Sequence, residues 1–297
     1  MTTTRRLREL LQREAPLLAP GAYDGITARL VAQAGFDAAY MTGAGTAATL
    51  GYPDFGLLTL SEMMENAGRV ALAAGIPVIA DADTGYGNAL NVTRTVREYE
   101  KRGIAGLHLE DQVSPKRCGH LDGKEIVPRE AWLANIRAAV AARRDPDFLL
   151  IARTDARAVA GFDEAIARAN AALDAGADMA FVEAVTSLEE LALVPKRVRG
   201  PCLLNIVPGG KSPIPSAAEA ASMGYRLIIY PSLLIESGIR AGDAALAALH
   251  ASGRPAANAG QINIVELFNR LGAQEWNALQ ERLATQTPES IQQGIEP

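Results

Sequence analysis

Several features that define common protein classes are scarce or absent in this chain of 297 residues. It has only two cysteines, Cys118 and Cys202, which are too few for a disulfide framework. A formal net charge of -5 argues against a broad basic surface for nucleic acid. No apolar run approaches the roughly 20 residues that span a bilayer, and the basic N-terminus lacks the apolar core of a signal peptide. We therefore expect a cytoplasmic protein that binds neither nucleic acid nor membranes.

Short apolar runs alternate with longer helical patterns from near the N-terminus to about residue 250. The predicted strands are Leu17–Pro20, Ala38–Thr42, Pro77–Asp81, Gly106–Glu110, Phe148–Arg153, Met179–Glu183, Cys202–Ile206 and Leu227–Pro231. The predicted helices include Ser61–Ala74, Asn91–Arg102, Arg129–Arg143, Asp163–Ala175 and Ala217–Met223. Continuous apolar strands alternating with helices indicate an α/β fold with a parallel sheet. About eight such units match a (β/α)₈ TIM barrel, and an open doubly wound sheet is the alternative.

Polar residues at the ends of the predicted strands favour the barrel. These residues are Thr42, Asp81, Asp83, Glu110, Arg153, Glu183 and Asn205. In a barrel the carboxyl ends of the strands meet on one face, where the loops build the active site. Helix capping could explain one or two of these residues. It does not explain an arginine and two glutamates, so the sequence predicts a functional site at this face.

The pattern changes after Pro255, which divides a predicted barrel of residues 1–254 from a C-terminal segment of residues 255–297. Residues 256–260 resemble a linker, and residues 285–297 are predicted to be poorly ordered. Between them we predict one amphipathic helix from the helical spacing of Ile262, Val265, Phe268, Leu271, Leu279 and Leu283. Its apolar face needs a partner, which is either a neighbouring subunit or the barrel wall.

The segment Asp81-Ala-Asp83 follows an apolar run and precedes two glycines. Side chains two residues apart on an extended chain point the same way, so both carboxylates can approach one ion. Together with Glu110 they offer the oxygen ligands that Mg²⁺ prefers, with some retained waters. The alternative is a turn stabilised by the aspartate side chains. We favour a metal site.

The loop that follows Glu110 carries Lys116, Arg117, Cys118 and His120. A cysteine near cations has the setting that favours a reactive thiol. A zinc site of Cys118 with His108 and His120 is weakly supported, because no second Cys or His pair has suitable spacing. The segment is also too polar for a core cysteine. We therefore predict that Cys118 acts as a catalytic acid, base or nucleophile, and that Cys202 only packs in its strand.

Two glycine-containing segments resemble phosphate-binding motifs. The segment starting at Gly43 follows a strand, but no acidic residue ends a strand about 20 residues later, as a dinucleotide fold requires. Its backbone N–H groups are instead predicted to bind a substrate carboxylate. The segment at Gly209 has Asn205 where the P-loop motif needs glycine, which excludes that motif.

Several motifs in this chain resemble those of the isocitrate lyase and phosphoenolpyruvate mutase superfamily, in particular its 2-methylisocitrate lyase and 2,3-dimethylmalate lyase branch. The similarity covers about residues 17–250. The matching motifs are Tyr40-Met-Thr-Gly, Pro53-Asp-Phe-Gly, Asp81-Ala-Asp, Glu110-Asp-Gln, Lys116-Arg-Cys-Gly-His, Ala152-Arg-Thr-Asp, Glu183 and Asn205. The Lys-Arg-Cys-Gly-His loop distinguishes the carbon–carbon lyases of this superfamily from its phosphonate-forming mutases.

The resemblance implies a Mg²⁺-dependent lyase, with Mn²⁺ as a substitute, that cleaves a 2-hydroxy di- or tricarboxylate to a 2-oxo acid and a carboxylate. It implies Mg²⁺ on Asp83, with Asp81 and Glu110 acting mainly through water. Arg153 and the N–H groups of Thr42, Gly43 and Ala44 would hold the substrate. The other implied site residues are Asp54, Glu183 and Asn205 around the substrate, and Cys118, Tyr40, Lys116, Arg117 and His120 in catalysis. Cys118 would be the general acid, with Tyr40 or a carboxylate-held water as the base. A homotetramer with exchanged C-terminal helices is also implied.

Departures from the family pattern bear on the substrate. The segment from Asn205 to Pro213 is more similar to the dimethylmalate lyase version of this loop. Methylisocitrate lyases carry an arginine where this chain has Glu236, although Arg240 lies one turn further on. An arginine is the natural partner for a third carboxylate. The resemblance therefore favours a substituted malate. An oxaloacetate decarboxylase or hydrolase is the alternative function. Pro231 weighs against the hydrolase, because these hydrolases are expected to have serine at this position. A phosphonomutase is a more distant alternative.

Overall fold

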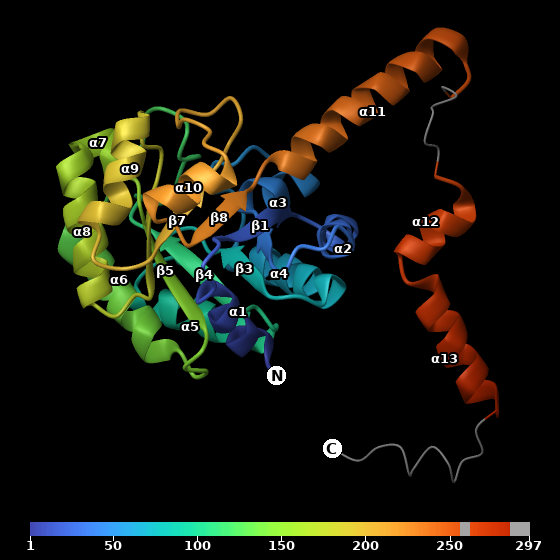
Figure 1. Ribbon diagram of the computed structural model, residues 1–297, viewed down its shortest axis with the longest axis horizontal. Coiled ribbons are helices and arrows are strands. Elements are labelled where there is room, and N and C mark those ends of the chain that lie inside the picture. The colour runs from blue at the N-terminus through green and yellow to red at the C-terminus, as the bar shows by residue number, and fades with distance from the viewer. Residues whose placement is uncertain (256–261, 286–297) are drawn as a thin grey trace. The chain divides into compact units, whose positions relative to one another are not determined.

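The computed structural model describes residues 1–255 and 262–285. Eight parallel strands form a closed barrel in chain order, from β1 next to β2 round to β8 next to β1 (Figure 1). The strands are β1 Leu17–Ala22, β2 Ala39–Met41, β3 Val78–Asp81, β4 Gly106–Glu110, β5 Leu149–Thr154, β6 Met179–Val182, β7 Cys202–Asn205 and β8 Leu227–Tyr230. The predicted TIM barrel is confirmed.

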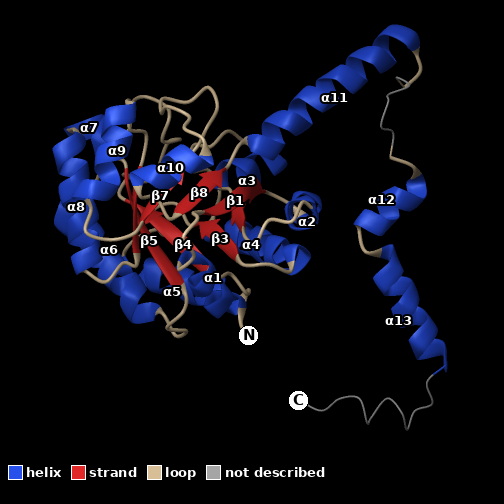
Figure 2. Cartoon of the chain, in the orientation of Figure 1, coloured by secondary structure: helices blue, strands red, loops and turns tan. Residues whose placement is uncertain are grey.

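Helices lie outside the strands and follow them in sequence (Figure 2). The helices up to residue 252 are α1 Thr3–Leu11, α2 Gly25–Gln33, α3 Gly43–Thr49, α4 Leu60–Ala74, α5 Ala89–Lys101, α6 Arg129–Ala142, α7 Ala156–Ala160, α8 Phe162–Asp174, α9 Leu188–Arg197, α10 Ala217–Met223 and α11 Leu233–Ser252. Local signals fix several ends. In α4, Thr59 and Glu62 form a capping box, and Gly75 ends the helix in the left-handed conformation.

The inside of the barrel is filled by apolar side chains from the strands and from α1. The members of this cluster include Leu7, Leu10, Ile79, Leu149, Ile151, Met179, Phe181, Leu203, Leu227 and Ile229. Close strand contact depends on Gly106, because a Cβ there would lie 2.6 Å from the Cβ of Leu149. The filled interior leaves no channel, so any ligand site must lie above the apolar cluster, at the ends of the strands.

The chain forms two compact units, Met1–Ala241 and Gly242–Pro297, whose boundary falls within α11. The second unit contains α12 Ile264–Arg270 and α13 Ala273–Thr285. The prediction of one continuous helix in this region is therefore wrong. Gly272, at a φ of 91°, separates the two helices, because a left-handed residue ends helical hydrogen bonding. The predicted linker at 256–260 and most of the predicted tail lie outside the described residues.

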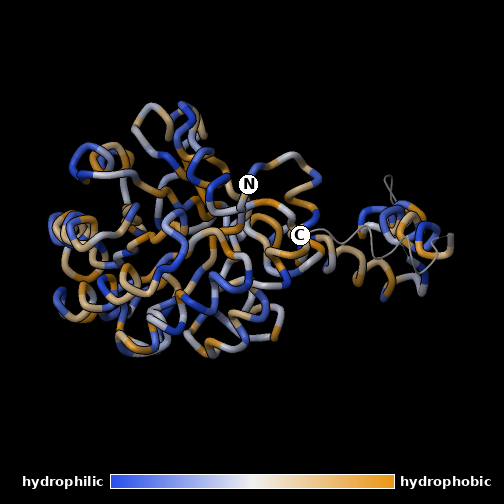
Figure 3. Tube along the Cα trace, turned by 90° about the horizontal axis from the view of Figure 1, so that it is seen from below, coloured by the Kyte–Doolittle hydropathy of each residue, from blue (hydrophilic) through white to orange (hydrophobic). Residues whose placement is uncertain are grey.

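Many apolar side chains of the second unit are exposed, and polar and apolar residues alternate along its helices (Figure 3). The exposed residues include Ile264, Val265, Phe268, Trp276 and Leu283. In the described part of the chain, no helix has the length and apolar character that crossing a membrane requires.

Candidate active site

A pocket of about 600 Å³ opens at the carboxyl ends of the barrel strands. Its lining residues are Tyr40, Thr42, Ala44, Gly45, Asp54, Asp81, Cys118, Gly119, His120, Arg153, Glu183, Asn205, Val207, Pro231, Ser232 and Ile235. The structure therefore brings most of the predicted site residues to one cavity. Gly43, Asp83, Glu110, Lys116 and Arg117 are outside this set, and their positions are described below.

Asp81 and Asp83 are buried at the end of β3. The Asp83 backbone N–H donates to Asp81 Oδ1 at 2.9 Å, and Asp83 has a φ of 46°, a strained conformation for a residue with a side chain. The buried Lys116 ammonium lies 2.9 Å from Asp83 Oδ1 and pairs with Asp54 as well. Burial raises the pKa of Asp83 to about 6 despite this lysine. The site thus concentrates more negative charge than one ammonium can neutralise.

Glu110, at the end of β4, adds a third buried carboxyl group. Its Oε2 lies 3.2 Å from Arg153 Nη1, and its Oε1 has no hydrogen-bond partner among the described residues. Burial raises the pKa of Glu110 well above its usual range. Within the described ranges, no three acidic, histidine or cysteine side chains enclose a metal position by themselves. The donor set fits Mg²⁺, which is commonly held by one or two carboxylates plus waters and substrate oxygens.

Arg153 is the buried cation of the pocket, and it is surrounded by carboxylates. Its Nε donates to Asp155 Oδ2 at 3.0 Å, and its Nη2 lies 3.5 Å from Glu183 Oε2. Glu183 is fixed in turn, because Asn205 Nδ2 donates to its Oε2 at 3.0 Å. The guanidinium also lies over the ring of Phe181, 5.2 Å from its centroid. Contacts with three carboxyl groups, those of Asp155, Glu110 and Glu183, thus fix the guanidinium of Arg153 in the lining of the pocket.

Thr42 and Gly43 form the start of α3. The Thr42 hydroxyl accepts from the Gly45 backbone N–H at 3.3 Å, so Thr42 is a helix cap as well as a pocket residue. A Cβ at Gly43 would lie 2.4 Å from Asp81 Oδ2. Glycine at this position therefore allows the backbone to approach the buried carboxylate.

Tyr40 and His108 form a buried pair in the centre of the barrel. Their Oη and Nε2 atoms are 2.8 Å apart, and Tyr40 Oη lies 3.4 Å from Asp81 Oδ2. Burial lowers the pKa of His108 to about 4 and raises the pKa of Tyr40 well above its usual value. Both groups are neutral at pH 7, so a Tyr40 phenolate is a costly base. From the sequence His108 was predicted only as a weak zinc ligand, and its pairing with Tyr40 was missed.

Residues 117–120, which we call the lid, cover the pocket. Cys118 is partly buried, and burial raises the pKa of its thiol. The expected activation of the thiol by neighbouring cations is therefore wrong. Lys116 faces Asp54 and Asp83, while Arg117 is exposed, with its guanidinium 6.0 Å from the centroid of the Phe55 ring. A protonated thiol suits a proton donor better than a nucleophile.

The lid lies directly on the charged residues of the barrel. A Cβ at Gly119 would lie 2.5 Å from Glu183 Cγ and 2.6 Å from Arg153 Nη2. His120 Nε2 is 3.5 Å from Glu183 Oε1, and its Nδ1 accepts from the Lys211 backbone N–H at 3.0 Å. The lid is therefore in contact with the barrel on one side and with the loop after β7 on the other.

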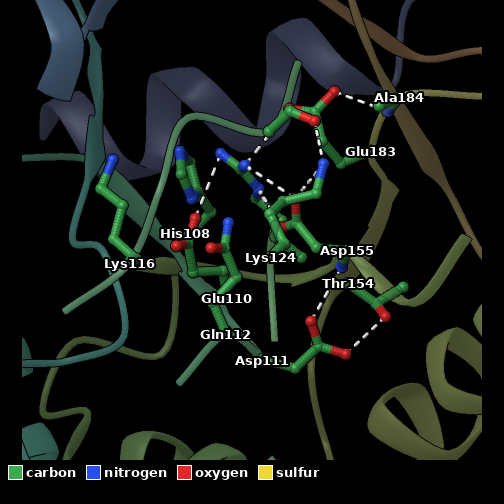
Figure 4. Close-up of polar contacts among 12 residues, drawn as sticks. His108, Glu110, Asp111, Gln112, Lys116, Lys124, Thr154, Asp155, Glu183 and Ala184 are labelled. Carbon is green, nitrogen blue, oxygen red and sulfur yellow. Dashed lines mark hydrogen bonds and ion pairs between the residues drawn. The ribbon is translucent and has the colours of Figure 1, made fainter. Parts of the chain in front are cut away.

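A second group of buried polar residues lies beside the pocket (Figure 4). Asp111 accepts from the Thr154 hydroxyl at 2.6 Å and from the Asp155 backbone N–H at 2.8 Å. Lys124, which follows the lid in sequence, lies 3.5 Å from Asp155. Neither Asp111 nor Lys124 was among the predicted site residues, and a single lysine in a polar loop, such as Lys124, gives no sign of being buried.

A closed parallel barrel with acidic, basic and thiol groups gathered at the strand ends defines an enzyme of the (β/α)₈ class. A family model described as phosphoenolpyruvate phosphomutase matches residues 7–250. The 2,3-dimethylmalate lyase of Eubacterium barkeri is 50% identical over 236 residues, which are 79% of this chain and 82% of that protein. The 2-methylisocitrate lyase of Aeropyrum pernix is 44% identical over 240 residues, 81% of this chain and 77% of that protein.

Solved structures agree with these relatives. An oxaloacetate acetylhydrolase bound to 3,3-difluorooxalacetate superimposes with a TM-score of 0.92 at 40% identity, covering 96% of this chain and 98% of that one. A phosphonopyruvate hydrolase in complex with oxalate and Mg²⁺ superimposes with a TM-score of 0.86 at 31% identity, covering 95% and 99%. The chain belongs to the isocitrate lyase and phosphoenolpyruvate mutase superfamily, and its relatives confirm the predicted lyase class.

Proposed function

We propose that this protein is a Mg²⁺-dependent carbon–carbon lyase that cleaves a 2-alkylmalate, such as 2,3-dimethylmalate, into a 2-oxo acid and a carboxylate. The observation that carries the proposal is the position of the protonated Cys118 thiol in the same pocket as Arg153. One group can hold the oxo-acid half of the substrate while the other delivers a proton to the departing half. The similarity to a 2,3-dimethylmalate lyase supports this choice of substrate class.

In the proposed reaction, Arg153 and the backbone N–H groups at Thr42–Ala44 bind the 2-hydroxy carboxylate end of the substrate. A base removes the hydroxyl proton, the C2–C3 bond breaks, and its electron pair remains on C3. The Cys118 S–H then protonates C3, which yields the carboxylate product. The thiolate regains a proton from solvent during product release. The high pKa of Tyr40 favours a carboxylate-held water over this phenol as the base.

Asp83, Asp81 and Glu110 are the proposed residues for Mg²⁺, with Asp83 in direct contact and the others acting through water. The bound ion would supply positive charge beside the substrate hydroxyl and carboxylate oxygens. The buried, partly unpartnered carboxyl groups described above support this assignment. Lys116, which directly precedes the lid, pairs with Asp83 and so helps to fix the position of its carboxylate.

The apolar part of the pocket lining supports a substrate with alkyl groups. It consists of Val207, Pro231 and Ile235, whose side chains have no group that binds a carboxylate. Neither Glu236 nor Arg240 lines the cavity. The third carboxylate of a tricarboxylate substrate would therefore lose its hydration in this part of the pocket without gaining a cation, which is unfavourable. Methyl groups can be buried against these side chains without that desolvation cost.

Action on oxaloacetate is the second candidate. The hydroxyl of Ser232 lies in the same pocket, is buried, and has no hydrogen-bond partner in the described part of the chain. Such a hydroxyl could contact the hydrate of a 2-oxo acid. The similarity to an oxaloacetate acetylhydrolase also favours this candidate.

We further propose that the second unit assembles with other copies of the chain, as a tetramer with exchanged C-terminal helices. The exposed apolar residues of α12 and α13 support this proposal, since such a surface in water favours association. Light scattering on the purified protein tests it: a mass of four chains is expected, and a monomer at micromolar concentration would contradict it.

Proton NMR of products tests the proposed activity. The enzyme is incubated with Mg²⁺ and, separately, with 2,3-dimethylmalate, 2-methylisocitrate and oxaloacetate. Pyruvate with propionate from the first substrate is the expected result. Pyruvate with succinate would show that a tricarboxylate is accepted. Oxalate with acetate, or accelerated formation of pyruvate from oxaloacetate, would replace the proposal with the second candidate.

A further inference from the structure

Lys124 is a buried lysine that contacts the lid and the barrel at the same time. Its side chain is 1% exposed. The ammonium donates to the backbone carbonyl oxygen of Gly119 and lies 3.5 Å from Asp155 Oδ1. Figure 4 shows its side chain directed toward Asp155. A buried ammonium is unfavourable unless it is paired, so these contacts fix its position.

Asp155 connects this lysine to the cation of the pocket. Its side chain is fully buried, and it accepts from Arg153 Nε at 3.0 Å and from Arg153 Nη2 at 3.3 Å. Its backbone N–H is held by Asp111. One carboxylate therefore lies between two cations, one that faces the pocket and one that holds the lid.

Gly119 is the lid residue next to Cys118, and its backbone rests on Arg153 and Glu183. Lys124 holds the carbonyl group of this residue, five positions earlier in the chain. At the other end of the lid, the Gln112 side chain accepts from the Arg117 N–H at 2.9 Å and donates to the Arg117 carbonyl at 2.8 Å. The backbone on both sides of Cys118 is thus held by buried side chains from outside the lid.

We propose that Lys124 is a positioning residue that ties the lid to Asp155, and so fixes the Cys118 thiol over the ligand held by Arg153. Lysine suits this role because its compact ammonium has three donors for partners in different directions. The inference deepens the proposed function, since it rests on the assignment of Cys118 as the proton donor. Its direct consequence for the lid can be measured without any substrate.

The test compares Lys124→Met and Lys124→Arg with Lys211→Met in the full chain. Lys211 is a matched control, because its ammonium pairs with Asp122, just after the lid in sequence, and not with Asp155. The probe is the rate at which 5,5′-dithiobis(2-nitrobenzoic acid) reacts with Cys118 in ligand-free protein. Cys202 is 1% exposed and reacts only on unfolding, so it reports the intact fold.

We expect Lys124→Met to raise the Cys118 reaction rate at least fivefold, with Cys202 still protected. Lys124→Arg and Lys211→Met should stay within twofold of the parent. In turnover, Lys124→Met should lower kcat at least tenfold per folded molecule, and Lys124→Arg should recover most of it. An unchanged Cys118 rate in folded Lys124→Met, or an equal rise in Lys211→Met, would overturn the proposal.

Asp155→Asn provides a second test if Lys124→Met does not fold. This change removes the charge between the two cations but keeps an oxygen for Arg153. It should raise the Cys118 rate more than Lys211→Met does, and an unchanged rate would refute the link through Asp155. Failure of the proposed function would give a different result. The thiol of Cys118 would still react faster in Lys124→Met, but the parent protein would form no product from any of the acids tested.

Discussion

Two layers of the barrel differ in chemistry although they come from the same strands. In the lower layer, inward-facing residues such as Ile79, Ile151 and Phe181 pack as an apolar core. Two residues further along each strand, the side chains are charged or polar and line the pocket region: Asp81, Arg153, Glu183 and, after Leu203, Asn205. Because successive side chains alternate, a step of two residues keeps the direction and changes only the height. The lower layer therefore stabilises the fold, and the upper layer carries the groups proposed for the chemistry.

The largest expected effect is the loss of turnover on metal removal, which acts only on the upper layer. Extensive dialysis against a chelator should abolish product formation, and Mg²⁺ or Mn²⁺ should restore it. In the proposed function, a bound Mg²⁺ beside these three carboxyl groups supplies the positive charge that the substrate oxygens contact. Circular dichroism should show an intact fold throughout. Full turnover in protein shown by elemental analysis to be metal-free would remove Asp81, Asp83 and Glu110 from their proposed role.

Replacement of the lid thiol should have the next largest effect. Cys118→Ser keeps the size of the side chain but is a much weaker acid, so kcat should fall by about 10²–10⁴, the usual contribution of general acid catalysis. Binding of Mg²⁺ with a 2-oxo acid, measured by calorimetry, should change little. Cys202→Ser is the matched control, since this cysteine lies in β7 with its side chain in the apolar cluster outside the barrel. Equal turnover in Cys118→Ser would exclude the thiol from the mechanism.

A change in the lower layer should give the opposite result. Leu149 is 2% exposed and lies on the same strand as Arg153. Leu149→Ala should lower the free energy of unfolding by about 2–5 kcal/mol, because it removes buried methyl groups and leaves a cavity. Denaturant titration measures this loss. The exposed Leu72→Ala should change stability by less than about 0.5 kcal/mol. A large drop in kcat of folded Leu149→Ala would show that the layers are not separate.

The smallest expected effect is the pH dependence of the lid. Burial lowers the pKa of His120, whose neutral Nδ1 accepts from the Lys211 N–H. The groups facing this ring are Glu183, Arg153, Lys124 and Asp155. Because the folded pKa is depressed, the unfolded state binds the proton more readily, and stability is lost as pH falls below about 6.5.

His120→Asn tests this expectation. The parent protein should lose more thermal stability between pH 7.5 and pH 5 than the variant does, by an amount on the order of 1 kcal/mol for each pKa unit of difference. Scanning calorimetry at the two pH values measures both proteins. Parallel losses would show that His120 does not contribute to the docking of the lid.

Most of the fold could be predicted from the sequence because buried parallel strands are continuous apolar runs. All eight predicted strands match observed strands to within two residues at each end. The predicted helices did not include α2, α3, α7, α9 or α11, and of these α3 and α7 are too short to show helical periodicity. The break between α12 and α13 was also missed. Gly272 lies within an otherwise helical pattern, and a single glycine there does not reveal its backbone conformation.

The site could be predicted in part, because polar residues at strand ends are visible in a sequence. Side-chain direction in loops is not. Lys116 and Lys124 are both buried, while Arg117 between them is exposed, and nothing in their residue types distinguishes them. The same limit applies to Cys118, whose pKa depends on burial by the folded lid and not on the cations next to it in sequence. Motifs in the sequence identified most of the site residues. Their contacts and their burial depend on the tertiary structure.

The most direct test of the central claim is cleavage of 2,3-dimethylmalate in deuterium oxide, followed by NMR. If a thiol in the closed site protonates C3, the propionate should carry a single deuterium at C2, placed on one face. Cys118→Ser should lose this product while still binding a 2-oxo acid. Propionate with deuterium on both faces, or formed at the same rate by the variant, would contradict the account.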